Sequence, residues 1–220
     1  RRCHVHRRWT GNCYCCGISV VLLSFHSLFR SRETLMRTSR LIPFVIIAAV
    51  FTISGCLRSL HPFYTEKTLV FETKLVGTWV DQDTSVWTFV QTGPKAYELV
   101  YTEKGSPGRF DAHLVKLGKF MFLDLFPKEP VLQNGFYKFH LVPVHSILRV
   151  WIEEEKLRMA MLNHDWFKEQ VDRKKVKLAH EHRENEIILT ASTADLQKFV
   201  VKYADDPKAF PEPADLRRMR

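Results

Sequence analysis

No cysteine follows Cys56 in this 220-residue chain, and the other four stand near its start, at Cys3, Cys13, Cys15 and Cys16. A small exported domain that is stabilised by disulfides carries paired cysteines in its body. This body has none, so its stability must rest on an apolar core. The four early cysteines also lack a second ligand pair at zinc-site spacing, which argues against a zinc site there.

Long apolar runs and a strongly charged body are missing as well. A membrane-spanning helix needs about 20 consecutive apolar residues, and the two apolar runs here, residues 18–29 and 41–53, are shorter. Residues 1–55 carry eight Lys/Arg and one acid, whereas residues 56–220 carry 25 basic against 23 acidic residues. The formal net charge of +9 therefore belongs mainly to the N-terminal segment, and no nucleic-acid partner is expected.

The body also lacks a phosphate-binding glycine loop, a dinucleotide fingerprint and a Gly-x-Ser-x-Gly elbow. These absences argue against several enzyme classes, and no cofactor is expected. Apolar residues make up 45% of the chain and aromatic residues 12%. That composition is sufficient for a packed core and is not typical of a disordered chain.

The segment that begins at Met36 has the order of an export signal. Two arginines follow Met36, and the uncharged run 41–53 (LIPFVIIAAVFTI) has the length of a secretory apolar region. Ser54 and Gly55, both small, then precede Cys56. An uncleaved membrane anchor that ends at Cys56 is the alternative.

Ile53-Ser54-Gly55-Cys56 resembles the lipobox of bacterial lipoproteins. The resemblance implies that the Cys56 thiol takes a diacylglyceryl group, that a signal peptidase cuts before Cys56, and that acyl chains attach the protein to a membrane of the cell envelope. A thiol is the one good nucleophile there for a thioether. Leu57 stands where many inner-membrane-retained enterobacterial lipoproteins have Asp. By this resemblance the outer membrane, on its periplasmic face, is favoured.

Short strands dominate the pattern of the body. β-branched and aromatic residues recur between turn-forming residues such as Gly105 and Gly118. Pro143 inside an apolar segment implies a bulge or an edge position. Regular short strands with turns between them predict an antiparallel meander. The strands are expected at residues 86–90, 96–101, 110–117, 120–126, 139–152, 157–162, 177–180 and 186–190.

Two short helices are expected within this β-rich pattern. Asn163 or His164 can cap a helix near residues 164–173, and Ser192 or Thr193 can begin one near 193–204. The second has one apolar stripe at helical spacing, formed by Leu196, Phe199, Val200 and Tyr203. The organisation that follows is 1–35, upstream translated sequence; 36–55, signal peptide; 56–67, tether; 68–206, β-rich domain; and 207–220, surface tail. For residues 1–35, a long leader or a first membrane segment stays open.

Gly77-Thr78-Trp79 opens the strand series. A Gly-x-Trp on the first strand resembles the entrance motif of lipocalins and related barrels, in which the Trp closes the barrel floor. The resemblance implies a mainly β fold, a lipocalin-like barrel, which we expect to be open or partly closed because of the helix at 164–173 and Pro143. It also implies a candidate small hydrophobic ligand inside the barrel.

Two groups of side chains are candidates for chemistry. His180 and His182 share a strand face and could approach one metal ion, but a solvated hairpin is the preferred interpretation, so no metal is assigned. No catalytic residue is assigned, and the candidates for such a role are His113, His140, His145 and Asp124. Ser146 cannot pair with its neighbour His145, because adjacent strand residues point to opposite faces.

Two hypotheses follow from the sequence. The first is a lipid-anchored envelope lipoprotein whose body is a binding or structural module without catalysis. The alternative is an envelope hydrolase that uses the histidines of the β body. Convergence of His113, His140 and His145 in one cleft would favour the hydrolase.

Overall fold

The computed structural model describes residues 57–183 and 186–219, all within the second of two compact units, Val50–Arg220. Cys56, the apolar runs 18–29 and 41–53, and the four early cysteines lie outside the described residues. No helix among the described residues is long and apolar enough to cross a membrane.

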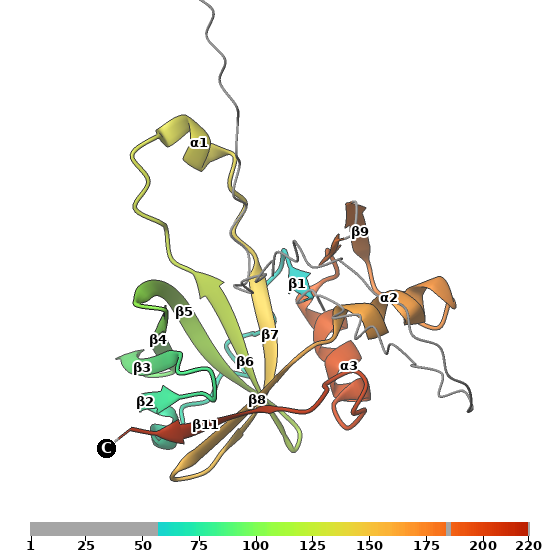
Figure 1. Cartoon of the computed structure of the whole chain (residues 1–220). Coiled ribbons are helices and arrows are strands. Elements are labelled where there is room, and N and C mark those ends of the chain that lie inside the picture. The colour runs from blue at the N-terminus through green and yellow to red at the C-terminus, as the bar shows by residue number, and fades with distance from the viewer. Residues whose placement is uncertain (1–56, 184–185, 220) are drawn as a thin grey trace, which may run out of the picture. The chain divides into compact units, whose positions relative to one another are not determined.

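A closed antiparallel barrel of eight strands forms the centre of the unit (Figure 1). Consecutive strands pair from β2 to β8, and β11 then pairs with both β8 and β2 to complete the ring. The mainly β antiparallel barrel predicted from the sequence is thus confirmed, and the ring is closed rather than open. Its strands are β2 (Gly77–Val80), β3 (Val86–Gly93), β4 (Ala96–Glu103), β5 (Ser106–Leu117), β6 (Phe120–Pro127), β7 (His145–Ile152), β8 (Lys156–Met161) and β11 (Ala214–Arg218).

Strand alternation separates two apolar cores. On β6, Leu123 and Leu125 point into the barrel, whereas Phe122 belongs to a second core on the outside. The β6 sequence is apolar on both faces because both faces are covered. The wall formed by β5, β6 and β7 therefore separates the barrel core from an outer core.

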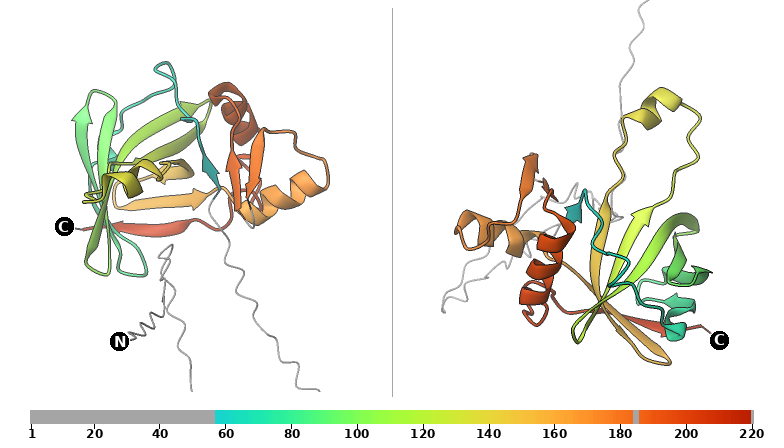
Figure 2. Two further views of the ribbon diagram at one scale, coloured as in Figure 1. Left: turned by 90° about the horizontal axis from the view of Figure 1, so that it is seen from above. Right: turned by 180° about the vertical axis from the view of Figure 1, so that it is seen from behind.

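A layer of short elements covers that wall on the outside. The sheet continues from the edge of β7 through β1 (Arg58–Ser59), β10 (Glu186–Leu189) and β9 (His180–Arg183). The helices α2 (His164–Asp172) and α3 (Thr193–Tyr203) lie on the same side of the barrel (Figure 2). Both predicted helices are thus confirmed. Asn163 caps α2 by accepting the backbone N–H of Trp166, and Ser192 caps α3 in the same way.

Two short helical turns lie in connections. A 3₁₀ turn (Thr73–Leu75) precedes β2, and α1 (Gly135–Phe139) lies in the long connection between β6 and β7. The strand expected at 139–152 begins only at His145, because Pro143 and the end of α1 occupy its first part. In Figure 1, α1 stands away from the barrel.

Two predicted segment boundaries were wrong. Residues 207–220 are not a surface tail, because β11 lies within them and buries Leu216 in the barrel core. The described part of 56–67 is not a free tether: Phe63 is fully buried in the outer core. Each segment buries only three residues, and they do not alternate regularly along the chain, so no strand periodicity can be read from them.

Arg218 of β11 lies over one end of the barrel. Its guanidinium stands 4.2 Å from the ring of Trp79, and Nη1 donates to the Val76 carbonyl oxygen at 2.9 Å. Gly77 has φ +133°, and a Cβ there would stand 2.5 Å from Nη1 of Arg218. Trp79 is fully buried and donates to the Leu75 carbonyl oxygen at 3.0 Å. Both Gly77 and Trp79 of the Gly-x-Trp motif thus lie against Arg218 at one end of the barrel.

Candidate functional site

Asp124 is the most deeply buried charged residue of the described part of the chain. It points outward from β6, yet the segment around Phe63 covers it and leaves it 0% exposed. Its Oδ2 accepts the backbone N–H of Phe63 at 2.8 Å. Its Oδ1 lies 2.7 Å from Nδ1 of His145. Both carboxylate oxygens therefore have protein partners, as burial of a charged group requires.

His145 lies beside Asp124 because β6 and β7 pair along their length. Its ring packs at 4.5 Å from the ring of Phe126, and its side chain is only 10% exposed. Ser59 of β1 stands opposite His145 in the ladder, but its hydroxyl donates to the carbonyl oxygen of His61 at 2.9 Å. The Ser59 hydroxyl is therefore not shown to be activated by His145 as a nucleophile.

His113 completes the cluster from β5, where it stands opposite Asp124 in the ladder. Its ring stacks on Tyr64 at 4.1 Å, and its buried Nδ1 has no hydrogen-bond partner. Burial lowers the pKa of His113, against the opposing influence of Asp124 and Asp111. Burial likewise raises the pKa of the Tyr64 hydroxyl, with Asp124 adding to the shift.

His140 does not join this cluster. It follows the end of α1, is exposed, and its Nδ1 lies 2.7 Å from the carbonyl oxygen of Phe136. Three of the four catalytic candidates thus converge, and one stands apart. Phe63 and Tyr64, which cover the cluster, were not predicted from the sequence. No local pattern links residues such as Phe63 and Asp124, which are 61 positions apart.

In this geometry the Asp124–His145–His113 cluster connects the segment around Phe63 to the strands of the barrel wall. Asp124 bonds the covering segment and β7 at once, so its carboxylate holds the segment to the barrel wall. Asp124, His113 and His145 line none of four prominent hollows on the described part of the chain. A substrate would have to displace the segment around Phe63 to reach the carboxylate.

His180 and His182 lie on β9 with ring centroids 6.1 Å apart. Nδ1 of His180 lies 2.7 Å from the carbonyl oxygen of Leu178. No third His, Cys, Asp or Glu joins them among residues 57–183 and 186–219 in an arrangement that could hold a metal ion. A zinc site needs at least three such protein ligands.

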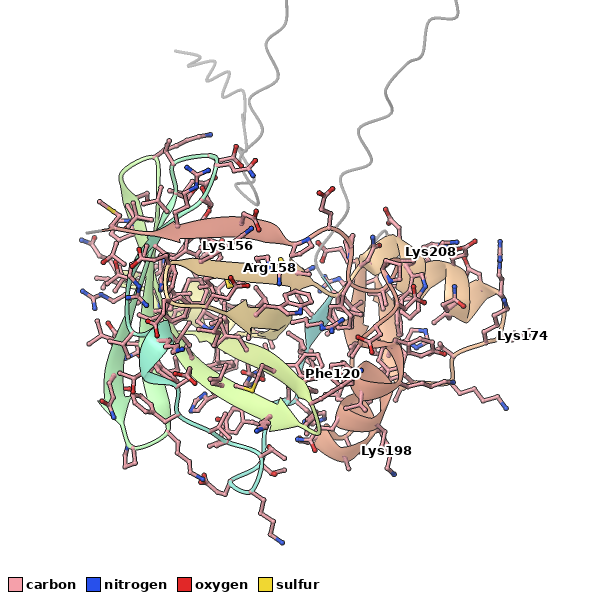
Figure 3. All side chains as sticks on the ribbon, turned by 90° about the horizontal axis from the view of Figure 1, so that it is seen from below. Phe120, Lys156, Arg158, Lys174, Lys198 and Lys208 are labelled. Carbon is pink, nitrogen blue, oxygen red and sulfur yellow. The ribbon has the colours of Figure 1, made fainter. Side chains whose placement is uncertain are left out.

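A cleft of about 580 Å³ lies near the turn between β5 and β6. Arg149 lies over the rings of Phe120 and Trp151 at 5.0 and 4.5 Å, and Arg158 lies 5.3 Å from the ring of Trp151. Asp205, just beyond α3, accepts from Arg149 at 2.9 Å and pairs with Lys119. Figure 3 shows Phe120 and Arg158 at this end, with Lys198 on the neighbouring helix. Asp205 pairs with both Arg149 and Lys119, and Lys116 and Arg158 also line the cleft beside Glu72 and Glu153. Basic side chains therefore outnumber acidic ones around it.

The interior of the barrel is filled by its own side chains. Trp79, Tyr97 and Leu114 are fully buried there, and Phe89 is nearly so. An eight-stranded ring is just wide enough for side chains to fill. The interior is therefore a packed core at these positions.

The connection between β6 and β7, residues 128–144, is apolar and exposed. We call it the β6–β7 loop. It carries seven of the eleven large apolar side chains that are exposed in the described part of the chain. They are Val131, Leu132, Phe136, Tyr137, Phe139, Leu141 and Val142. The sequence pattern predicted a strand from residue 139 and indicated no role for Phe136, Tyr137 or Phe139, although the three lie within four positions of one another.

The comparisons with known proteins assign no family. No family model, no curated protein and no solved structure matches this chain.

Proposed function

We propose that this protein is a lipid-anchored lipoprotein of the bacterial cell envelope, attached to a membrane through acyl chains on Cys56. The observation that carries the proposal is the order of the signal: two arginines after Met36, the apolar run 41–53, then Ile53-Ser54-Gly55-Cys56. Leu57 is 2% exposed and part of the outer core, so the packed body begins directly after the proposed anchor. Two or three acyl chains give durable attachment, whereas one holds only marginally.

The barrel unit serves as a binding or structural module in this proposal. The Asp124 cluster favours this role over the alternative envelope hydrolase, because its carboxylate oxygens hold Phe63 and His145. His140, which the hydrolase hypothesis also uses, stands apart on an exposed loop. The filled interior likewise favours surface contacts over a small hydrophobic ligand held within the ring. Leu57 after Cys56 supports the outer membrane as the site of attachment.

Mass spectrometry of the protein extracted from membranes tests the anchor. We expect a mature chain that begins at Cys56 and carries diacylglyceryl and acyl mass. Cys56→Ala removes the thiol that forms the thioether, so we expect residues 36–55 to stay attached and the acyl mass to disappear. Ser54→Ala, which keeps a small residue, is the matched control and should be processed normally. An unmodified Cys56 with Met36 still attached would contradict the proposal.

A further inference from the structure

The β6–β7 loop presents an unusual amount of apolar surface for a connection. Phe136 and Phe139 are 77% and 81% exposed, and Val131 is fully exposed. A hollow of about 400 Å³ lies at the base of the loop, lined by the end of β6 and by the two arms of the loop itself. The aromatic side chains of α1 therefore do not pack back on the barrel. Contiguous exposed apolar surface of this kind marks an interaction site.

The charged residues of the loop are neutralised by neighbours. Lys138 pairs with Glu129 inside the loop, and Lys128 pairs with Glu98 and Asp111 of the barrel. The segment 130–137 carries no charged side chain. A partner of this surface therefore needs an apolar face and no complementary charge.

The base of the loop lies close to the first described residue. The loop ends where β7 begins at His145, and His145 stands opposite Ser59 of β1. Leu57 is two positions before Ser59, about 7 Å along an extended strand. Figures 1 and 2 show β1 beside the start of β7, at the end from which α1 projects. The residue after Cys56 and the base of the apolar loop therefore lie at one end of the barrel.

We propose that the β6–β7 loop inserts its exposed apolar side chains into the surface of the bilayer that holds the Cys56 anchor. This inference rests on the proposed lipid attachment, which brings a bilayer to the end of the barrel where Leu57 lies. Aromatic and aliphatic side chains on a short helix enter the boundary between headgroups and acyl chains to a depth of about 5–10 Å. Lipid contact also fits the paired charges, since no headgroup of a particular sign is required. The loop thus provides a second contact, which fixes the orientation of the barrel on the membrane.

Fluorescence quenching in vesicles tests the contact with the whole protein. Phe139→Trp is compared with Val90→Trp, a position on β3 that is 49% exposed, in phosphatidylcholine vesicles brominated on the acyl chains. Both variants are read as differences from the unsubstituted protein, since the proposed mature chain has four tryptophans of its own, Trp79, Trp87, Trp151 and Trp166. We expect bromine to quench the added tryptophan at 139 at least about twofold more strongly than that at 90, because only the first reaches the acyl chains. Aqueous iodide should give the opposite order.

Equal bromine quenching at the two positions would overturn the insertion. Shielding of the tryptophan at 139 from both bromine and iodide would overturn it as well, and would assign the loop to contact with a second copy or another protein. Circular dichroism confirms that each variant is folded. The mass of the Cys56 peptide, measured on the same samples, reports the lipid attachment separately. Failure of the anchor and failure of the loop contact are therefore distinguishable.

Discussion

At the scale of single residues, Asp124 shows how a charge is accommodated on an apolar wall. Desolvation of an isolated carboxylate is costly, and it is offset here by the backbone N–H of Phe63 and the ring of His145. Asp124 faces outward from β6, on the same side as Phe122. The sequence could not predict the segment that covers this position, because that contact joins residues 61 positions apart.

Asp124→Ala should destabilise the protein strongly. The substitution leaves the Phe63 N–H and the His145 ring without their buried acceptor, and we expect a loss of about 2–4 kcal/mol in the free energy of unfolding. Urea unfolding followed by circular dichroism measures it. Asp111→Ala is the matched control on the neighbouring strand, where the side chain is 50% exposed, and should cost less than about 1 kcal/mol. Equal losses for the two variants would show that Asp124 does not hold the segment around Phe63 to the barrel wall.

His113 should make stability fall in mild acid. Its pKa is lowered in the folded state by burial, so the unfolded chain binds the proton more readily below the unperturbed value of about 6.5. The free energy of unfolding should therefore decrease as the pH falls from about 6.5 towards the folded-state pKa of His113. His113→Gln should flatten this slope in urea titrations at a series of pH values. His140→Gln, at an exposed position, should retain the slope of the unsubstituted protein; a retained slope in His113→Gln would contradict the prediction.

At the scale of elements, β11 decides whether the barrel closes. Its sequence ADLRR buries only Leu216, so no alternation was visible, and three nearby prolines indicated a tail. When β8 and β2 are separated by the width of one strand, each has a free edge. An extended segment that lies between them, here β11, pairs with both edges. Arg218 then adds side-chain contacts that a charge count does not predict. The helices α2 and α3, by contrast, were predictable, because their caps and apolar stripe are local patterns.

Arg218→Ala should weaken the closure of the barrel. The guanidinium donates to the carbonyl oxygens of Lys74, Val76 and Glu154 and covers the ring of Trp79. Its removal should cost about 1–3 kcal/mol in the free energy of unfolding. Arg217→Ala, one residue earlier and exposed, should change stability by no more than about 0.5 kcal/mol. Thermal and urea unfolding of the two variants compare them, and equal stability would show that Arg218 does not hold the end of the barrel.

At the scale of the whole unit, two cores share one wall. Phe122 and Ile147 face the outer core, and Leu123 and Leu148 face the barrel core from the same two strands. Neither core can lose its wall without exposing the other, which couples the barrel to the helical layer. The same arrangement brings Leu57 and the base of the β6–β7 loop to one end of the unit. The proposed membrane contacts through Cys56 and the loop are consistent with this placement.

The sequence by itself determined what depends on local order: the strand alternation, the caps of α2 and α3, and the mainly β class. Tertiary structure alone decided the closure through β11, the burial of Asp124 under Phe63, and the separation of His140 from His113 and His145. The physical reason is the separation along the chain between the residues that interact. A cap or an alternating strand is specified within a few neighbouring residues, whereas ring closure and the buried contact between Asp124 and His145 depend on which distant segments meet. The lipobox at Cys56, a short linear motif, stays a prediction from the sequence.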